Sequence, residues 1–327
     1  MTLSTFRLIQ IIFVLALALG ASPARAASCS GIMTNVSFGT VNPLVPRDVL
    51  ASGRLTVTCR WDFGLGLLPN VNVCIRLGVG SGGGGTPRWL TNGSQTLAFN
   101  LYVDNSYTNG AAWGGPAIPG TAQIGSDFTG ILGLFTASRE FTVYGKIPGA
   151  VLAGASVAGG ALYRTSFAGQ GSVHFAFGTL LGQRCTDGGS SSFSFEADVT
   201  IASECETQAA VLDFGAAGTL GATRRASAVL NVRCTAGKPY QIVLDAGKHG
   251  SVAARKMRNA ATGETIAYSL SNSAGGERWG DGTLGTLVHR SVGSGMLDSV
   301  TIHGTVPAQQ TPSPGSYQDT VTVTITF

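Results

Sequence analysis

Hydrophobic and polar residues alternate along most of this chain, which is the pattern of half-buried β-strands. In the last eight residues the apolar positions, separated by threonines, are Val321, Val323, Ile325 and Phe327. A second clear run has Phe193, Phe195, Ala197, Val199 and Ile201. Glycine-rich stretches separate such blocks, and no long helical period competes with them. We therefore predict an all-β fold built of immunoglobulin-like Greek-key β-sandwiches.

The blocks occur twice in the same order, so the chain carries an internal repeat. The segments 29–59 and 205–234 both begin and end on cysteine, carry Phe-Gly early and end on Val-x-Cys. Further matched blocks are 73–80 with 240–247, 88–92 with 255–259, 97–101 with 266–270, 113–114 with 279–280, and 141–145 with 300–304. We predict an N-terminal domain over 27–190 and a C-terminal domain over 191–327, with 191–201 as a linker strand.

The first 26 residues have the features of a secretory signal peptide. Arg7 precedes the apolar run 8–19, and the small-residue site 24–26 follows it. Such a run is too short for a comfortable membrane span, so we expect cleavage after Ala26 and export. Without Arg7 and Arg25 the formal charge falls from +4 to +2 (4 − 2). This near-neutral balance argues against nucleic acid as a partner.

Six cysteines in an exported chain indicate disulfides. The repeat makes Cys29–Cys59 and Cys205–Cys234 equivalent pairs, which leaves Cys74–Cys185 by elimination. The chain has no Cys-x-x-Cys, and its four histidines are scattered, so we expect no metal or cofactor. No Gly-x-Ser-x-Gly or His-Glu-x-x-His motif occurs, and we expect no enzymatic activity.

The first copy of the repeat is longer than the second. The difference in residue number between matched residues of the two copies falls three times along the chain, from 175 to 167, from 166 to 159, and from 159 to 154. Each fall marks an insertion in the first copy. The insertions have 8, 7 and 5 residues and lie within 61–70, 114–140 and 148–162. Loops are usually polar, whereas these are apolar and glycine-rich. They form either a satellite core under long loops or an exposed patch that binds a surface. The candidate surface-binding residues are Leu65, Leu67, Leu68, Trp113, Ile118, Ile131, Leu132, Val151, Leu152 and Val157.

Several motifs together resemble the spore coat protein U domain, a family that includes subunits of archaic, Csu-type chaperone–usher pili. They are Cys…Phe-Gly…Val-x-Cys, Pro-Tyr-x-Ile-x-Leu at 239–244, and Pro-Gly-Ser-Tyr-Gln-Asp-Thr-Val-Thr-Val at 314–323. The first copy matches more loosely, since Thr165 stands where the second has Asp319. The resemblance implies sandwiches that lack their last strand, which a periplasmic pilus chaperone and then an adjacent pilin supply by β-augmentation.

Only Ala27 and Ser28 precede Cys29 in the expected mature chain, which is too short for a donor strand. A two-domain member of this kind resembles the tip adhesin of such pili, delivered through the periplasm and an outer-membrane usher to the cell surface. The segment 192–201 has the donor pattern, and it either completes the first domain or opens the second. We expect the C-terminal domain to lack its last strand, with its groove along Val321, Val323, Ile325 and Phe327.

The expected function is attachment of bacteria to hydrophobic or host surfaces and initiation of biofilms, with many weak contacts multiplied by avidity. Two alternatives stay open. A sugar-binding, lectin-type tip would need an aromatic platform, for which Trp61, Trp89 and Trp113 are available. A structural coat or pilus-shaft protein is the other alternative.

Overall fold

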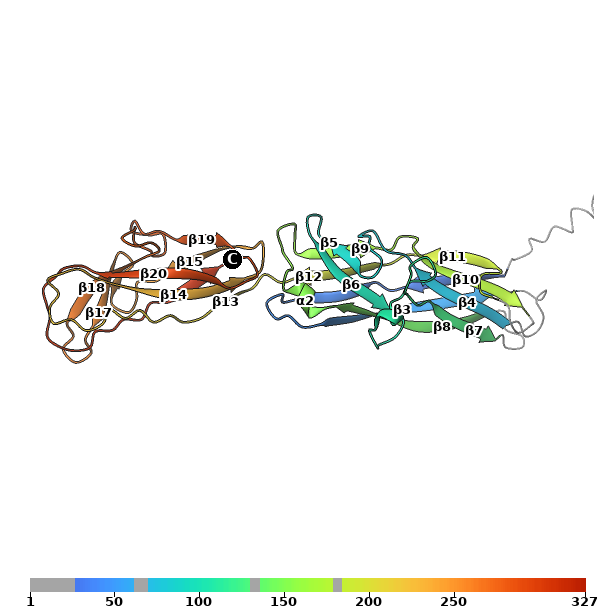
Figure 1. Cartoon of the computed structure of the whole chain (residues 1–327), viewed down its shortest axis with the longest axis horizontal. Coiled ribbons are helices and arrows are strands. Elements are labelled where there is room, and N and C mark those ends of the chain that lie inside the picture. The colour runs from blue at the N-terminus through green and yellow to red at the C-terminus, as the bar shows by residue number, and fades with distance from the viewer. Residues whose placement is uncertain (1–26, 62–69, 130–135, 179–183) are drawn as a thin grey trace, which may run out of the picture.

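Two β-sandwiches lie end to end in the computed structural model, which describes residues 27–61, 70–129, 136–178 and 184–327 (Figure 1). Domain 1 comprises residues 27–201 and domain 2 residues 202–327, as divided by strand pairing. Only two short helices, η2 (Asn109–Ala111) and α2 (Gly149–Leu152), interrupt the strands within the described residues. The predicted all-β class is confirmed. No helix of the described part is long and apolar enough to cross a membrane.

Domain 1 has an eight-stranded and a four-stranded sheet. The first has the order β1 (Ser28–Met33), β3 (Val49–Arg60), β8 (Thr136–Ile147), β6 (Thr96–Tyr102), β5 (Arg88–Thr91), β9 (Leu162–Ser166), β12 (Glu196–Ile201) and β2 (Val36–Val41). The second has the order β11 (Gly189–Phe193), β10 (Gly171–Gly178), β4 (Asn70–Leu77) and β7 (Ile124–Thr129). Their alternating apolar residues meet in one core.

Domain 2 repeats this plan with fewer and mostly shorter strands. Its larger sheet has the order β13 (Cys205–Thr207), β14 (Arg224–Cys234), β20 (Asp298–Val306), β18 (Thr265–Ser271), β17 (Ala254–Arg258) and β16 (Gly250–Ser251). The smaller sheet has the order β19 (His289–Val292), β15 (Pro239–Leu244) and β21 (Val323–Thr326). A separate core lies between them.

Matched residues of the repeat make matched contacts. Trp113 and Trp279 are both fully buried, and their indole Nε1 atoms donate to the carbonyls of Ile75 and Ile242, at 3.1 and 2.9 Å. The buried Arg88 likewise donates to the carbonyl of Trp113, as Arg255 does to that of Trp279. The internal repeat is therefore a repeat of structure.

All three predicted disulfides are present: Cys29–Cys59, Cys74–Cys185 and Cys205–Cys234. The first and third join directly paired residues, of β1 with β3 and of β13 with β14. The second ties β4 to the segment just before β11. Each domain is thus stapled where its first strand joins the sheet.

Candidate functional site: an open groove in domain 2

Strand β12 completes domain 1 from within the chain. It runs antiparallel to β9, with Ala197 opposite Thr165, and parallel to β2, with Ala197 opposite Val36. Its residues Ala197, Val199 and Ile201 are buried in the core of domain 1. Of the two roles that the sequence left open for 192–201, the pairing matches completion of the first domain.

The residues just before β12 join the other sheet. Strand β11 pairs antiparallel with β10, with Phe193 opposite Gly171. The rings of Phe193 and Phe195 stack on Trp113, each with centroids 6.3 Å apart, and Phe195 also stacks on Phe167 at 4.6 Å. The segment 189–201 therefore contributes to both sheets, as the edge strand β11 of the smaller sheet and as β12 between β9 and β2 of the larger one.

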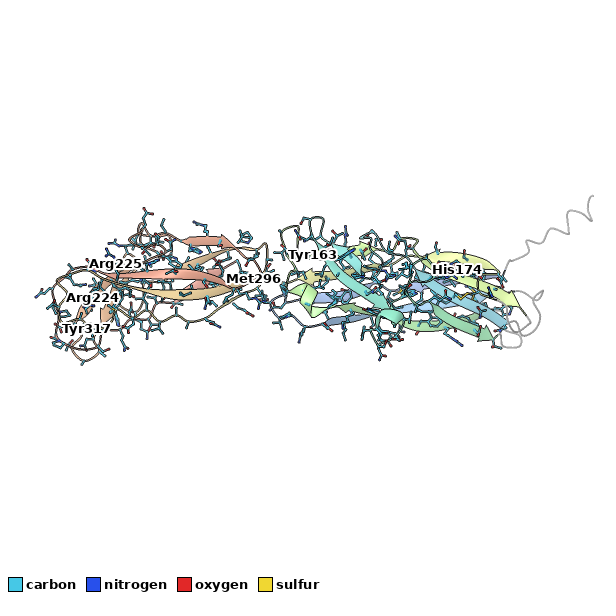
Figure 2. All side chains as sticks on the ribbon, in the orientation of Figure 1. Tyr163, His174, Arg224, Arg225, Met296 and Tyr317 are labelled. Carbon is cyan, nitrogen blue, oxygen red and sulfur yellow. A yellow bond between two sulfur atoms is a disulfide. The ribbon has the colours of Figure 1, made fainter. Side chains whose placement is uncertain are left out.

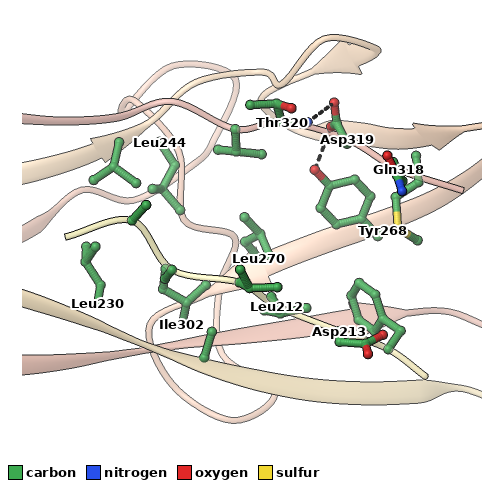
Figure 3. A pocket seen from close by; sticks show the side chains of 18 of the residues that line it. Leu212, Asp213, Leu230, Leu244, Tyr268, Leu270, Ile302, Gln318, Asp319 and Thr320 are labelled. Carbon is green, nitrogen blue, oxygen red and sulfur yellow. Dashed lines mark hydrogen bonds between the residues drawn. The ribbon is translucent and has the colours of Figure 1, made fainter.

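Domain 2 has an open groove at the position that β12 occupies in domain 1. The repeat matches β2 to the segment around Phe214 and matches β9 to residues 316–320. These two segments form the rims of a groove of about 830 Å³ (Figure 3). Its apolar floor includes Leu230, Leu244, Leu270 and Ile302, which the repeat matches to the buried Leu55, Leu77, Leu101 and Val143 of domain 1.

The rim residues of the groove are more exposed than their counterparts in domain 1, which lie beside β12. Val36 and Phe38 of β2 are buried, whereas their counterparts Leu212 and Phe214 are only half-buried. Likewise Phe167 is fully buried, while its counterpart Val321 is half-buried. Apolar side chains with unpaired backbone beside them are the two features that an added strand would cover.

The four residues predicted for the groove divide into two pairs. Val321 and Val323 line it. Ile325 and Phe327 do not line it. Ile325 pairs with Ile242 of β15. In domain 1 the equivalent pairing is that of Val173 of β10 with Ile75 of β4. In domain 1 the other side of β10 is covered by β11, but within the described residues β21 is an edge strand. Ile325 and Phe327 therefore belong to this edge beyond the groove, and Phe327 is 48% exposed.

One polar pair stands in the groove. The Tyr268 hydroxyl donates to Asp319 Oδ2 at 2.6 Å (Figure 3). Burial raises the pKa of Tyr268, and the Asp319 carboxylate raises it further, so the phenol stays a donor. Sequence reasoning missed this pair, although the mismatch between Thr165 and Asp319 was a signal. In the described ranges no group of three or more His, Cys, Asp or Glu could hold a metal ion.

Two residues predicted to contact an external surface are in the core instead. Trp113 and Leu152 are both 0% exposed. Trp113 is held by Phe193 and Phe195, and Leu152 belongs to the short helix α2, which packs into domain 1. Apolar loop residues formed part of the core here, which corrects the prediction for both side chains.

The third insertion lies at the junction between the domains. Val157 N donates to the carbonyl of Ala236 in domain 2 at 2.9 Å, and Ser156 forms a β-bridge with the same residue. Val151 and Val157 are half-buried and pack against the core of domain 1. Figure 1 shows α2 at the end of domain 1 that faces domain 2.

The other two insertions start from the opposite end of domain 1. Leu65, Leu67, Leu68, Ile131 and Leu132 lie outside the described residues. The described residues that flank them are adjacent, because Asn70 pairs with both Thr129 and Gly178, and Arg60 pairs with Thr136. This end is farthest from domain 2 (Figure 1). Ile118 is half-buried in a turn before β7, where its carbonyl accepts from the Thr121 hydroxyl.

A family model for the spore coat protein U domain matches residues 15–165 and again 191–324, which is most of the chain. The chain belongs to the spore coat protein U domain family. Each match contains one copy of the repeat, and the second also includes β12, which pairs with strands of domain 1.

A curated relative, Protein U of Myxococcus xanthus, is 39% identical over 105 residues, which are 30% of this chain and 58% of that protein. The chain thus spans little more than half of that relative. Two solved structures are distantly similar. One is the CsuC–CsuE chaperone–tip adhesion subunit pre-assembly complex of archaic Csu pili of Acinetobacter baumannii, at 15% identity, a TM-score of 0.48, and coverage of 92% of this chain and 100% of that one. The other is a chaperone–tip adhesin complex of CFA/I fimbriae, at 10% identity, a TM-score of 0.33, and coverage of 90% and 95%.

Proposed function

We propose that this chain is a pilus subunit whose domain 2 accepts an extended strand, first from a periplasmic chaperone delivering it to an outer-membrane usher and then from the adjacent pilin. One observation carries the proposal. Domain 1 contains the closed form of a site, with β12 between β2 and β9, and domain 2 has the same site open.

The closed site indicates how a donor would lie in the open one. By analogy with β12, the donor runs antiparallel to residues 316–320 and parallel to the segment around Phe214. Its alternate side chains then face the floor at the positions of Phe195, Ala197, Val199 and Ile201. Each apolar side chain that is fully buried contributes about 1.5–3 kcal/mol, so four contribute roughly 6–12 kcal/mol as an upper estimate.

The same analogy gives the direction of the fibre. Strand β12 leads out of domain 1 directly into domain 2. A donor in the same orientation would leave domain 2 beside Tyr317, which lies at the end of the molecule away from domain 1 (Figure 2). Successive subunits would then follow in line, with domain 1 pointing away from them. This arrangement suits a subunit at the pilus tip, with domain 1 free to contact a surface.

The attachment site that we propose is the end of domain 1 that carries the apolar segments 62–69 and 130–135. Their leucines and isoleucine are Leu65, Leu67, Leu68, Ile131, Leu132 and Leu134. The described residues that flank these segments support the proposal, because Asn70 pairs with Thr129 and Arg60 pairs with Thr136. Contacts to a hydrophobic or host surface would gain from the number of pili on one cell.

No observation favours a lectin-type or coat role. Trp61 and Trp113 are buried, so two of the three tryptophans considered for a sugar platform are not available at the surface of the described structure. We propose no catalytic role for this chain.

The test of strand acceptance is a chain that supplies its own donor. A copy of residues 189–201 would be fused after Phe327 through a linker as long as residues 179–188, the connection that joins β10 to β11. We expect domain 2 to gain thermal stability and protease resistance. The matched control carries Val199→Asp in the appended copy only, because one charge on the inward face opposes burial. Equal stability of the two fusions and the unfused chain would refute strand acceptance.

A further inference from the structure

Two matched positions of the repeat differ together in a way that adds a hydrogen bond to domain 2. Phe99 of domain 1 corresponds to Tyr268, and Thr165 corresponds to Asp319. Phe99 has no hydroxyl, so domain 1 cannot form the contact that Tyr268 makes with Asp319 at 2.6 Å. Because both domains are in one chain, domain 1 serves as an internal comparison for this pair.

In domain 1 the strand that holds Thr165 is secured by its neighbours. Strand β9 pairs with β12 over five residues and with β5 at Thr91. The Thr165 side chain accepts one hydrogen bond from a backbone amide, that of Gly82, at 3.0 Å. A threonine is sufficient here because β12 covers the strand on its open side.

In domain 2 the corresponding segment, 316–320, has no strand on its groove side within the described residues. On the other side it is joined to Arg258 by two backbone hydrogen bonds of Gln318, at 2.9 and 3.1 Å. The Tyr317 hydroxyl also contacts Glu264 Oε2 at 3.5 Å, and just beyond the segment Thr322 N donates to Asp245 Oδ1 at 2.8 Å. Asp319 supplies two further attachments. Its Oδ1 accepts from Lys248 N at 2.8 Å, and its Oδ2 accepts from the Tyr268 hydroxyl. One carboxylate therefore ties the rim to a loop and to the floor of the groove.

The chemistry of the pair makes this tie firm. Tyr268 is buried in the core of domain 2, so its hydroxyl would be left without a partner if the rim moved away. An unsatisfied buried donor costs more than an ordinary hydrogen bond contributes, and a carboxylate acceptor strengthens the bond. Movement of residues 316–321 out of the strand position is thereby penalised.

We propose that Tyr268 and Asp319 form a latch that holds the rim of the empty groove in the strand position, so that an incoming strand meets a preformed edge. This inference rests on the proposed function of the groove. The latch replaces, on the open domain, the support that β12 gives to β9 in domain 1. The latch should increase the rate at which a strand enters the groove, because the edge is already ordered and does not have to become ordered during association.

The experiment measures strand entry into the full mature chain. The probe is a fluorescent synthetic peptide with the sequence of residues 189–201, mixed in stopped flow with the unmodified chain, Tyr268→Phe and Asp319→Thr. We expect association to slow by about two- to tenfold in each variant, the range for one lost hydrogen bond. Dissociation should change less, and the double variant should be no slower than the slower single one, because both changes remove the same contact.

A matched control is available in Tyr240→Phe. The Tyr240 hydroxyl donates to Asp298 Oδ2 at 2.9 Å in the same domain, and Tyr240 does not line the groove. It loses the same kind of bond, so its association rate should equal that of the unmodified chain. Equal slowing by Tyr240→Phe and Tyr268→Phe, or no slowing by either, would overturn the latch. Failure of the unmodified chain to bind the peptide would instead overturn the proposed function of the groove.

Hydrogen exchange of the free chain gives a second readout that needs no peptide. Backbone amides of residues 316–322 should exchange faster in Tyr268→Phe than in Tyr240→Phe. Unchanged exchange in both would contradict the latch even if a variant proved too unstable for the kinetic measurement.

Discussion

The ring of Phe195 stacks on that of Phe167 with centroids 4.6 Å apart and planes 12° from parallel. Phe195 immediately precedes β12, and Phe167 follows β9, so the contact joins the completing segment to the strand that it covers. In domain 2 the counterpart of Phe167 is Val321, which lines the groove. One chain thus holds a closed and an open version of the same edge.

Truncation of Phe195 to alanine should destabilise domain 1. Phe195 is buried and also stacks on Trp113, so we expect a loss of about 3–5 kcal/mol in the free energy of unfolding. Chemical denaturation with the disulfides intact measures it. The control is Glu196→Ala, an exposed neighbour, which should change stability by less than about 0.5 kcal/mol. Similar values for both would show that the segment does not support the core.

The strand pattern and the repeat made much of this fold predictable. Alternation identified β12 through Val199 and Ile201, and the two Cys-to-Cys segments fixed the disulfides. The alternation of apolar and polar residues could not show which domain β12 completes, because a strand with one apolar face can pack against the core of either domain. Burial of Trp113 and Leu152 was missed for a related reason, since an apolar loop residue has no period that distinguishes core from surface. The Tyr268–Asp319 contact depends on side chains 51 residues apart, which no local pattern brings together.

Loss of the disulfide Cys74–Cys185 should cost more than loss of Cys29–Cys59. The two bridges close loops with sequence separations of 111 and 30 residues. In the chain-entropy model these correspond to about 4.8 and about 3.6 kcal/mol of stability. Paired Cys→Ala variants compared by urea denaturation give the difference. A larger loss from the shorter loop would show that native contacts around Cys29 and Cys59, rather than the unfolded chain, dominate.

Removal of Arg233 should loosen the junction between the domains. Its Nη1 donates to the carbonyl of Leu44 in domain 1 at 3.2 Å, and its Nε donates to Gly295 at 3.0 Å. Arg233→Ala loses both bonds, so we expect small-angle scattering to show a broader range of domain orientations, while each domain keeps its melting temperature. The control Arg290→Ala removes an exposed arginine on β19. Identical scattering from both variants would show that Arg233 does not hold the junction.

Surface attachment should depend on the far end of domain 1 and not on the third insertion. Replacement of Leu67 and Leu68 by serine should lower bacterial attachment to polystyrene several-fold, with pilus assembly unchanged, because fully burying each leucine contributes about 1.5–3 kcal/mol. The control is Leu50→Ser, an exposed leucine of β3, which should attach normally. Leu152→Ser should instead lower the stability of domain 1, since that side chain is buried. Normal attachment by the Leu67/Leu68 double variant would exclude this segment and move the adhesive site elsewhere on domain 1.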